Sequence, residues 1–515
     1  LTELNWIRKA PKEDYKLIDD INATPTKNWN NGKGWKPIGE QNYEFYGTLN
    51  GDGYKISNLT IDRPNEELVG FIAITGSDAV IKNLKVKGLS ATGYNYIGGL
   101  LGENNGEILN LDYEATVTLS HYTNYAGGLV GLDRGGSFEE IHANVTINQS
   151  DQDNTETVGG LVGDLDGDMV NSSAMGTIKL SKSQLGGLVG SLDGTIRNSN
   201  SSVNVQGESE IGGLVGRNDY GKIISSYSTG NVTGDEEVGG LVGLNDEDGG
   251  IKNSYSTSKV TGNRSIGGLV GYNNGRITES YSIGNVTGNT YDGGLVGWNV
   301  GTVESSFWNT QTSGLIESDG GEGLNINQMQ SRDTFTSDMA LLSLETNQLK
   351  EENLTGDNNT LEAVKVYDEE SATFDVNAEY YSGEINDEFE LGNNYTAELI
   401  DIQNYEDDNG LIQFKISKKG SWLIYNSTSH QDINPIYTWN IVDGETYPFL
   451  SWEGSSGETT INRHNLTVEV EDNEGNSLEN ASVKIDSYDR ETGEDGQTLF
   501  EELLESDYTA IVDKE

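Results

Sequence analysis

The 515-residue chain contains no cysteine, which excludes disulfides, thiolate metal sites and a cysteine nucleophile. Proline is scarce, at 6 residues, and the histidines are limited to four scattered positions, His121, His142, His430 and His464. The sequence contains no HExxH motif, Walker loop, dinucleotide fingerprint or GxSxG elbow. We therefore expect no catalytic residues and a protein that is not an enzyme.

Long apolar segments are also missing, because no run of 18 apolar residues occurs and no signal peptide is recognisable. The chain starts abruptly at LTELNWIRKA and stops within the strand-like YTAIVDKE. We expect processing or truncation at both ends, so any membrane attachment would use an anchor outside this chain.

Basic residues are few, since 32 Lys and Arg stand against 83 Asp and Glu, for a formal net charge of −51. Such a chain repels itself in dilute buffer, whereas at 1 M salt the Debye length falls to about 3 Å and the repulsion is screened. The composition therefore predicts a protein of an extreme halophile, most simply archaeal; an ordinary acidic secreted protein is the alternative. Nucleic acid and anionic membrane surfaces are poor partners for it.

Glycine, by contrast, is abundant at 66 residues and recurs periodically. A Leu-Val-Gly or Leu-Leu-Gly motif begins at Leu68, Leu100, Leu129, Leu161, Leu188, Leu214, Leu241, Leu269 and Leu295. The interval between motifs is 26 to 32 residues and settles near 27 in the second half. A repeat of this length indicates a stacked solenoid.

One repeat, residues 265–288, contains three short apolar runs, IGGLVG, GRITESYS and GNVTG, each bounded by Gly or Asn. Strands this short cannot bury a face alone, but stacked coils would form three parallel sheets around one core. The glycines before each Leu would allow close approach of the next coil. Alignment of the repeats predicts two interior columns of β-branched residues: Ile196, Ile223, Ile251, Ile277 and Val303, and Val205, Val232, Val260 and Val286. The predicted fold is all-β, a right-handed parallel β-helix with coils of about 27 residues.

An outward column of aromatic residues is the first candidate binding site. It comprises Tyr227, Tyr255, Tyr281 and Phe307, at equivalent positions of four successive coils. Stacked aromatic rings would form a platform for sugars. The alternative is a ladder of rings that only stiffens the sheet.

The acidic turns after each Leu-Val-Gly are the second candidate, as a Ca²⁺ site. The candidate ligands are Asp164, Asp166, Asp168, Asp246 and Asp248. Their carboxylate oxygens are suitable Ca²⁺ ligands, although no EF-hand spacing is present. The alternative is turn chemistry and solubility, because Asp and Asn favour such turns.

The repeated (I/V)GGLVG…G.I..SYS.GNVTG resembles the GLUG motif of bacterial and archaeal surface proteins, regions of IgA-specific metallopeptidases and filamentous-haemagglutinin-like adhesins. The resemblance covers residues from about Tyr15 to Gln330 and implies a surface protein; without HExxH, the peptidase activity is not carried over. GWKPIGEQNYEFYGTLNGDGYKISNLTI resembles the opening coils of the family, where Trp35, Pro37 and Phe45 would cover the first rung. WNIVDGETYPFLSW resembles its final segment.

These features divide the chain into four parts. Residues 1–336 form the β-helix, and residues 437–458 form a return segment packing on its end. Residues 337–436 depart from the family pattern: SDMALLSLETNQLKEEN predicts a helix, and period-two alternation, as in LIQFKISKKGSWLIYNS, predicts an inserted β-sandwich-like domain. Residues 459–515 resemble a carboxypeptidase-regulatory-like β-sandwich that stops before its last strand.

Asn-X-Ser/Thr sequons outside the β-helix predict glycosylation of an exported protein, at Asn353, Asn358, Asn394, Asn426 and Asn480. The leading interpretation is a non-enzymatic, extracellular cell-surface adhesin or structural protein. Its repetitive face would offer many weak contacts to a glycan or protein of another cell, and avidity would supply affinity. Three alternatives stay open: a filament or layer subunit that assembles with copies of itself, a viral receptor-binding fibre, and a β-helix enzyme that cleaves polysaccharides.

Overall fold

The computed structural model describes residues 1–120, 123–149, 155–181, 184–335, 438–442 and 446–454, together with the backbone of the further strands named below. Two compact units divide the chain, Leu1–Ile326 with Ile461–Glu515, and Asn327–Thr460. Helices in the described part are short: η1 (Leu4–Lys9), η2 (Thr24–Gly32), α1 (Ile326–Met329), α2 (Arg332–Phe335) and η4 (Ser451–Gly454). None of the helices described there has the length and apolar character to cross a membrane.

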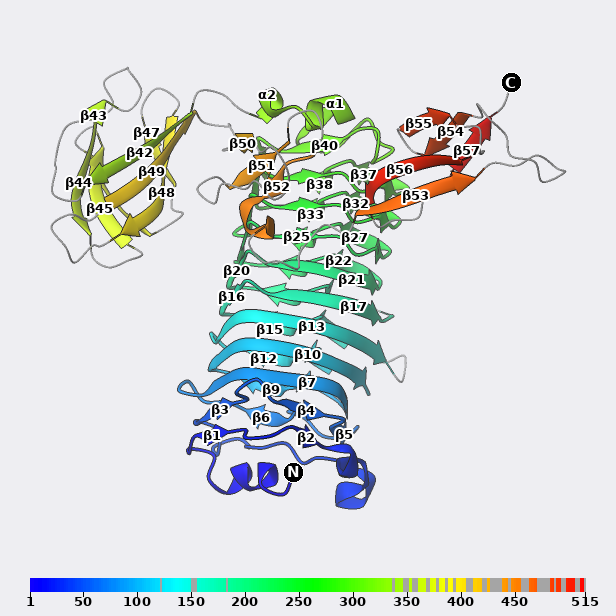
Figure 1. The fold of residues 1–515 in the computed structure, drawn as a ribbon, viewed down its shortest axis with the longest axis vertical. Coiled ribbons are helices and arrows are strands. Elements are labelled where there is room, and N and C mark those ends of the chain that lie inside the picture. Colours follow the sequence, from blue (N-terminus) through cyan, green and yellow to red (C-terminus); the bar gives the residue numbers. More distant parts are fainter. Residues whose placement is uncertain are drawn as a thin grey trace. The chain divides into compact units, whose positions relative to one another are not determined.

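The first unit contains a parallel β-solenoid of about nine turns of roughly 27 residues, which confirms the predicted fold class (Figure 1). Its described strands form three sheets in which neighbouring strands are parallel, and each strand pairs with the equivalent strand of the next turn. Sheet 1 has 24 strands, sheet 2 has 8 and sheet 3 has 9.

The strands of sheet 1 are β1 (Tyr15–Lys16), β2 (Ile21–Asn22), β3 (Thr48–Asn50), β4 (Lys55–Ser57), β5 (Thr60–Asp62), β7 (Val80–Gly93), β10 (Glu107–Leu119), β13 (Ser137–Gln149), β16 (Asp168–Val170), β17 (Ser173–Lys179), β20 (Thr195–Arg197), β21 (Asn200–Gln206), β24 (Lys222–Ile224), β25 (Tyr227–Ser228), β26 (Val232–Thr233), β29 (Gly250–Lys252), β30 (Tyr255–Ser256), β31 (Val260–Thr261), β34 (Arg276–Thr278), β35 (Tyr281–Ser282), β36 (Val286–Thr287), β39 (Thr302–Glu304), β40 (Phe307–Asn309) and β41 (Glu322–Leu324).

The strands of sheet 2 are β8 (Ile97–Gly98), β11 (Thr123–Gly127), β14 (Thr155–Gly159), β18 (Gln184–Gly186), β22 (Ser209–Gly212), β27 (Glu236–Gly239), β32 (Arg264–Gly267) and β37 (Thr290–Gly293). Those of sheet 3 are β6 (Ile72–Ile74), β9 (Leu101–Asn104), β12 (Val130–Asp133), β15 (Val162–Leu165), β19 (Val189–Leu192), β23 (Val215–Asn218), β28 (Val242–Asn245), β33 (Val270–Asn273) and β38 (Val296–Asn299).

The three runs of a repeat do not map one to one onto the three sheets, contrary to the sequence prediction. IGGLVG bends at its Gly-Gly-Leu corner, so that β32 belongs to sheet 2 and β33 to sheet 3, whereas β34, β35 and β36 all belong to sheet 1. The corner requires glycine, because a Cβ on Gly267 would lie 1.9 Å from the Val270 oxygen and one on Gly268 would lie 2.2 Å from the Gly294 oxygen. The predicted close approach at these glycines is therefore confirmed.

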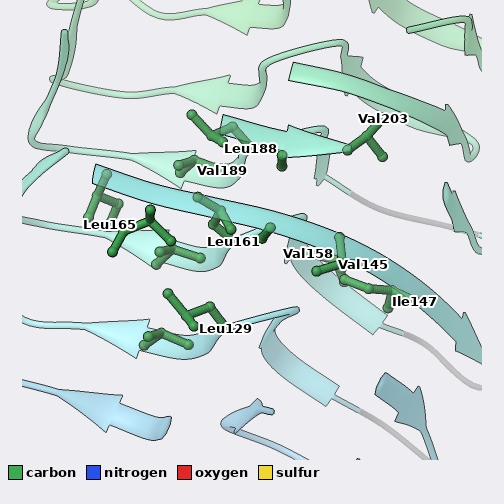
Figure 2. Close-up of a cluster of buried hydrophobic side chains, with 14 of the residues drawn as sticks. Leu129, Val145, Ile147, Val158, Leu161, Leu165, Leu188, Val189 and Val203 are labelled. Atoms are coloured by element: carbon green, nitrogen blue, oxygen red, sulfur yellow. The ribbon is translucent and has the colours of Figure 1, made fainter. Parts of the chain in front are cut away.

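The interior columns follow the predicted register. Ile196, Ile223 and Ile251 pair in sequence across sheet 1 and are at most 1% exposed, and the Val205–Val232 pair continues the second column. Figure 2 shows the Leu residues of successive motifs, among them Leu129, Leu161 and Leu188, together inside the solenoid. From Leu100 onwards, the first two residues of every motif are both buried, because the corner turns the backbone between them.

Buried polar side chains form two hydrogen-bonded ladders that run from turn to turn. In the serine ladder, each hydroxyl donates to the carbonyl two residues earlier and accepts from a backbone N–H of the preceding turn, as Ser254 Oγ does with Lys252 O and Ser226 N. In the asparagine ladder, Asn245 Nδ2 donates to Asn273 Oδ1 at 2.8 Å, and Asn273 Nδ2 to Asn299 Oδ1 at 2.7 Å. The ladders pair most of their buried polar groups, although Asn218 Oδ1, at the start of the asparagine ladder, has no hydrogen-bond partner among the described residues.

Side chains of the flanking segments bind the outer backbone groups of the solenoid. Near its start, Asp14 Oδ1 accepts from Thr48 N and Asp20 Oδ1 from Lys55 N. Of the three residues expected to cover the first rung, Trp35 and Phe45 are fully buried there, and Pro37 is partly exposed. Near its end, Ser318 Oγ accepts from the backbone N–H groups of Leu295 and Val296. These contacts protect strand edges that could otherwise pair with another chain.

The second unit contains two four-stranded antiparallel sheets. One comprises β42 (Met339–Glu345), β47 (Glu388–Leu391), β48 (Tyr395–Gln403) and β49 (Leu411–Lys418), and the other β43 (Glu352–Asn353), β44 (Thr360–Val366), β45 (Ser371–Val376) and β46 (Glu379–Glu384). The helix predicted from SDMALLSLETNQLKEEN is wrong over Met339–Glu345, because these residues form β42 and pair along their whole length with β49. Pairing with a distant strand overrides the local helical propensity.

A three-stranded sheet of the same unit comprises β50 (Ile424–Asn426), β51 (Trp439–Ile441) and β52 (Phe449–Leu450). The C-terminal residues form two small antiparallel sheets from β53 (Arg463–Glu469) and β56 (Gln497–Leu504), and from β54 (Ser482–Ile485), β55 (Tyr488–Glu491) and β57 (Ala510–Asp513). The sandwich domains and the four domain boundaries stay predictions.

Candidate functional site

The aromatic column of sheet 1 forms as predicted, but it is not an open platform. Tyr227 stacks on Tyr255 with 4.8 Å between ring centroids, and Tyr255 on Tyr281 with 5.0 Å. Phe307 pairs with Tyr281 on the next turn. The exposed fractions of the four residues are 5%, 0%, 1% and 9%, so protein atoms cover the rings. The prediction of an accessible sugar platform is therefore wrong at this column, and the rings form a buried stacking ladder.

The outward column of sheet 3 lies directly after the glycine of each Leu-Val-Gly and is chemically varied. Its register runs through Glu103, Leu132, Asp164, Ser191, Arg217, Leu244, Tyr272 and Trp298. The next position holds the buried asparagine ladder over its last four turns. The side chain at the outward position therefore changes from turn to turn, from buried Leu132 and Ser191 to partly exposed Tyr272 and Trp298, while the asparagine ladder repeats only in the last four turns.

Two acidic residues of these turns, Asp164 and Asp133, have raised pKa values. Burial, together with the neighbouring Asp166 and Asp193 carboxylates, raises the pKa of Asp164 to about 7. Burial also raises the pKa of Asp133 to about 6, although Asn104 Nδ2 and nearby backbone N–H groups donate to its carboxylate. Both side chains therefore hold a proton more tightly in the folded protein than in the unfolded chain.

Arg217 lies at the centre of the acidic turns. Its guanidinium bonds Asp219 Oδ1 at 2.7 Å and Asp246 Oδ2 at 2.8 Å, and it lies 3.8 Å from Glu210 Oε2. Asp246 also accepts from Asn274 Nδ2. The Arg217 guanidinium therefore interacts with the carboxylates of three acidic residues.

The five aspartates predicted to bind Ca²⁺ do not converge. Asp164 and Asp246 lie three turns apart along sheet 3, and Asp166, Asp168 and Asp248 are exposed. Within the ranges that the structure describes, no group of three His, Asp or Glu side chains is arranged to hold a metal ion. Stacking brings equivalent positions of adjacent turns close together, but Asp164 and Asp246 belong to turns that are not adjacent.

Three aromatic side chains lie close together on the outer face of the last turns. No aromatic cluster was expected from the sequence at this position. Tyr272 of β33 and Trp298 of β38 have ring centroids 6.1 Å apart and tilted by 43°, and Tyr291 of β37 lies 4.6 Å from Trp298 with a tilt of 41°. The Arg264 guanidinium lies 5.9 Å from the Trp298 ring. The sequence signal that could have predicted this cluster is the aromatic residue directly after the motif glycine, in VGYN and VGWN.

One arrangement resembles a hydrolytic triad in composition only. Asp112, His142 and Ser173 lie in register on three successive turns of sheet 1. His142 Nδ1 bonds Ser173 Oγ at 2.8 Å, but Asp112 Oδ1 bonds Lys87 Nζ at 2.7 Å. His142 and Ser173 therefore form an exposed hydrogen-bonded pair, while the Asp112 carboxylate binds Lys87. In a catalytic triad, by contrast, the carboxylate orients the imidazole.

Two predicted glycosylation sites can be placed on the backbone. Asn353 ends β43 and Asn426 ends β50. Asn358, Asn394 and Asn480 lie outside the described residues. Their glycosylation stays a prediction.

Comparison with known proteins supports the repeat assignment. Three successive segments, residues 207–233, 234–261 and 262–287, match the model described as the GLUG motif. Each match ends in the third apolar run of its repeat, so the motif period coincides with one solenoid turn. The chain therefore carries GLUG repeats folded as a parallel β-solenoid.

Two relatives are similar to part of the chain. A 136-residue stretch, 25% of this chain, is 43% identical to Halomucin of Haloquadratum walsbyi and covers 2% of that protein. A 103-residue stretch, 19% of this chain, is 34% identical to a protein of Evansella cellulosilytica described as a Gly-rich membrane protein, and covers 12% of it. The chain thus spans a small fraction of the length of either relative. Together, the matches indicate a surface or structural protein.

Proposed function

We propose that this chain is the presenting part of a non-enzymatic, extracellular adhesin on the surface of an extreme halophile. One observation carries the proposal: the inward columns of the solenoid repeat from turn to turn, while the outward column of sheet 3 changes from Glu103 to Trp298. A scaffold with constant packing and a variable face is suited to presenting many separate contacts. Partners are glycans or proteins of another cell.

The halophile part of the proposal is supported by the net charge of −51 and by the similarity to Halomucin. The surface location is supported by both relatives. The mechanism is avidity, in which tethered copies bind much more tightly than one chain does.

A retention assay tests the proposal. The chain, as a monomer and as a tetramer on streptavidin, is added to archaeal cells and to immobilised surface glycans in 3 M NaCl. We expect saturable retention that is about 100-fold stronger for the tetramer. Equal, non-saturable retention of both forms would contradict it. Ordered filaments of the chain alone would favour the layer-subunit alternative, and release of reducing ends from polysaccharides would favour the enzyme.

A further inference from the structure

We propose that Tyr272, Tyr291 and Trp298 form a binding site for an uncharged pyranose sugar on the outer face of the last solenoid turns. This inference rests on the proposed function, because it names the ligand class of one part of the presented surface. These three rings differ from the buried aromatic column of sheet 1, where the sequence had predicted a sugar-binding platform.

The three rings form an angled surface that a sugar ring can contact. Trp298 lies between the two tyrosines, which tilt by 43° and 41° relative to its plane. Tyr291 is 51% exposed, and Tyr272 and Trp298 are partly exposed. The C–H groups on one face of a pyranose pack on the electron-rich face of an aromatic ring, while phenol and indole N–H groups stay available for hydrogen bonds.

The solenoid does not require aromatic residues at these positions. In the preceding turn, Leu244 occupies the position of Tyr272, and in the turns before it the column holds Arg217 and Ser191. At the position of Tyr291, the preceding turn has Ser265.

Tyr291 also adopts the left-handed backbone conformation, with φ of 56°. This conformation is uncommon for a bulky residue and costs of order 1 kcal/mol or more. The equivalent residues of the three preceding turns, Glu210, Glu237 and Ser265, adopt the same conformation, so the solenoid imposes the positive φ at this position. A short side chain such as that of Ser265 meets this requirement, so the fold gives no reason for a bulky, half-exposed ring there.

The surroundings favour an uncharged ligand. A cationic ligand would compete with Arg264, whose guanidinium already lies 5.9 Å from the Trp298 ring. An anionic ligand would have to compete with Glu236, whose carboxylate already lies 3.7 Å from the Arg264 guanidinium. A neutral sugar avoids both conflicts and can use Arg264 and the exposed Thr290 hydroxyl as hydrogen-bonding groups.

The size of the surface also favours a small ligand over a protein. A whole aromatic side chain contributes about 150–250 Å², and these three are partly covered, so they expose less than the roughly 800 Å² per partner of a stable protein interface. Two or three sugar rings match this area.

The test uses the whole chain in 3 M NaCl, with cellohexaose, mannohexaose and maltohexaose as neutral probes and hexagalacturonate as the anionic probe. The variants Trp298→Leu, Tyr272→Leu and Tyr291→Ser each place a small or aliphatic residue on the face; the last two copy the residue of the preceding turn, so the fold tolerates them. Tyr220→Ser is the matched control, because Tyr220 is 65% exposed and is not one of the three rings.

We expect at least one neutral hexaose to bind, with each of the three variants weakening association about 10-fold or more and the control staying within about twofold. Three results would overturn the proposal: binding of hexagalacturonate alone, binding that the variants leave unchanged, or no binding to any hexaose. A concentration-dependent dimer that Trp298→Leu makes monomeric would instead assign the rings to a contact between copies. The two proposals fail separately. If no hexaose binds but cells still retain the chain, only the sugar site is wrong. If cells do not retain the chain, the proposed adhesin function is wrong.

Discussion

At the scale of single residues, the most demanding feature is the buried asparagine ladder. Asn245 accepts from Asn218 Nδ2, donates to Asn273 Oδ1 and also donates to Gly249 O. All of these side chains are fully buried. A buried amide that loses its partners costs about 1–3 kcal/mol, so every member depends on its neighbours in the turns above and below.

Replacing the central member of the ladder tests this dependence. We expect Asn245→Ala to lower the free energy of unfolding by about 2–4 kcal/mol, because Asn218 Nδ2 loses its acceptor and Asn273 Oδ1 loses its donor. Urea titration in 3 M NaCl measures the change. The control is Asn231→Ala, which changes an exposed asparagine of the solenoid. It should change the free energy of unfolding by less than about 0.5 kcal/mol. A similar cost for both variants would show that the ladder adds nothing to stability.

The raised pKa of Asp164 predicts how stability depends on pH. Its folded pKa of about 7 lies above its ordinary value of 3.8, so the folded state binds the proton more tightly. The stabilising contribution is complete below pH 3.8 and is lost as the pH rises through 7. Asp164→Ser, which copies Ser191 of the next turn, removes this contribution.

We therefore expect Asp164→Ser to be more stable than the parent by about 1–2 kcal/mol at pH 8, with the advantage vanishing near pH 4. Comparison of the two proteins by urea titration between pH 4 and 8 isolates this group from the other carboxylates. An advantage that grows towards low pH would contradict the assigned direction.

At the scale of elements, the Gly-Gly-Leu corner determines how each turn closes. The corner separates sheets 2 and 3, and its glycines contact backbone oxygens of the same and the next turn. A methyl group there cannot be accommodated by a rotamer change, because backbone atoms are the neighbours. The corner therefore explains why glycine recurs in every repeat.

Two glycine substitutions compare a corner with an open strand position. A Cβ on Gly240 would lie 2.1 Å from Gly268 O and 2.3 Å from Ser256 Oγ, whereas nothing lies within 4 Å of one on Gly250. We expect Gly240→Ala to lower stability by more than about 3 kcal/mol and Gly250→Ala to change it little. If Gly240→Ala folds only in part, hydrogen exchange should show lost protection around residues 239–270 first. Equal tolerance of both would contradict the corner argument.

At the scale of the whole molecule, the charge is unevenly distributed along the chain. Residues 1–90 hold 12 basic and 12 acidic residues, whereas residues 91–326 hold 10 basic and 29 acidic. The first turns are therefore balanced, and the later turns repel one another in dilute buffer. Within the solenoid, screening by salt therefore acts mainly on the later turns.

Hydrogen exchange across a salt series tests this distribution. Between 0.1 and 3 M NaCl, we expect amide protection in residues 91–326 to rise at least about tenfold more than in residues 1–90. An equal response of both regions would show that local charge balance does not control the salt dependence. A fold that is equally stable at both salt concentrations would contradict the halophile interpretation altogether.

The sequence by itself determined the solenoid, its period, its interior columns and even the register of Tyr227 on Tyr255, because identical turns must align to bury repeated apolar residues. It did not determine the burial of that column, which depends on what covers an outward face. Nor did it determine that Met339–Glu345 is a strand, since its partner β49 lies about 70 residues away. The contact between Tyr291 and Trp298 was likewise decided by tertiary structure, because the glycine corner brings sheet 2 and sheet 3 together at an angle that no spacing in the sequence encodes.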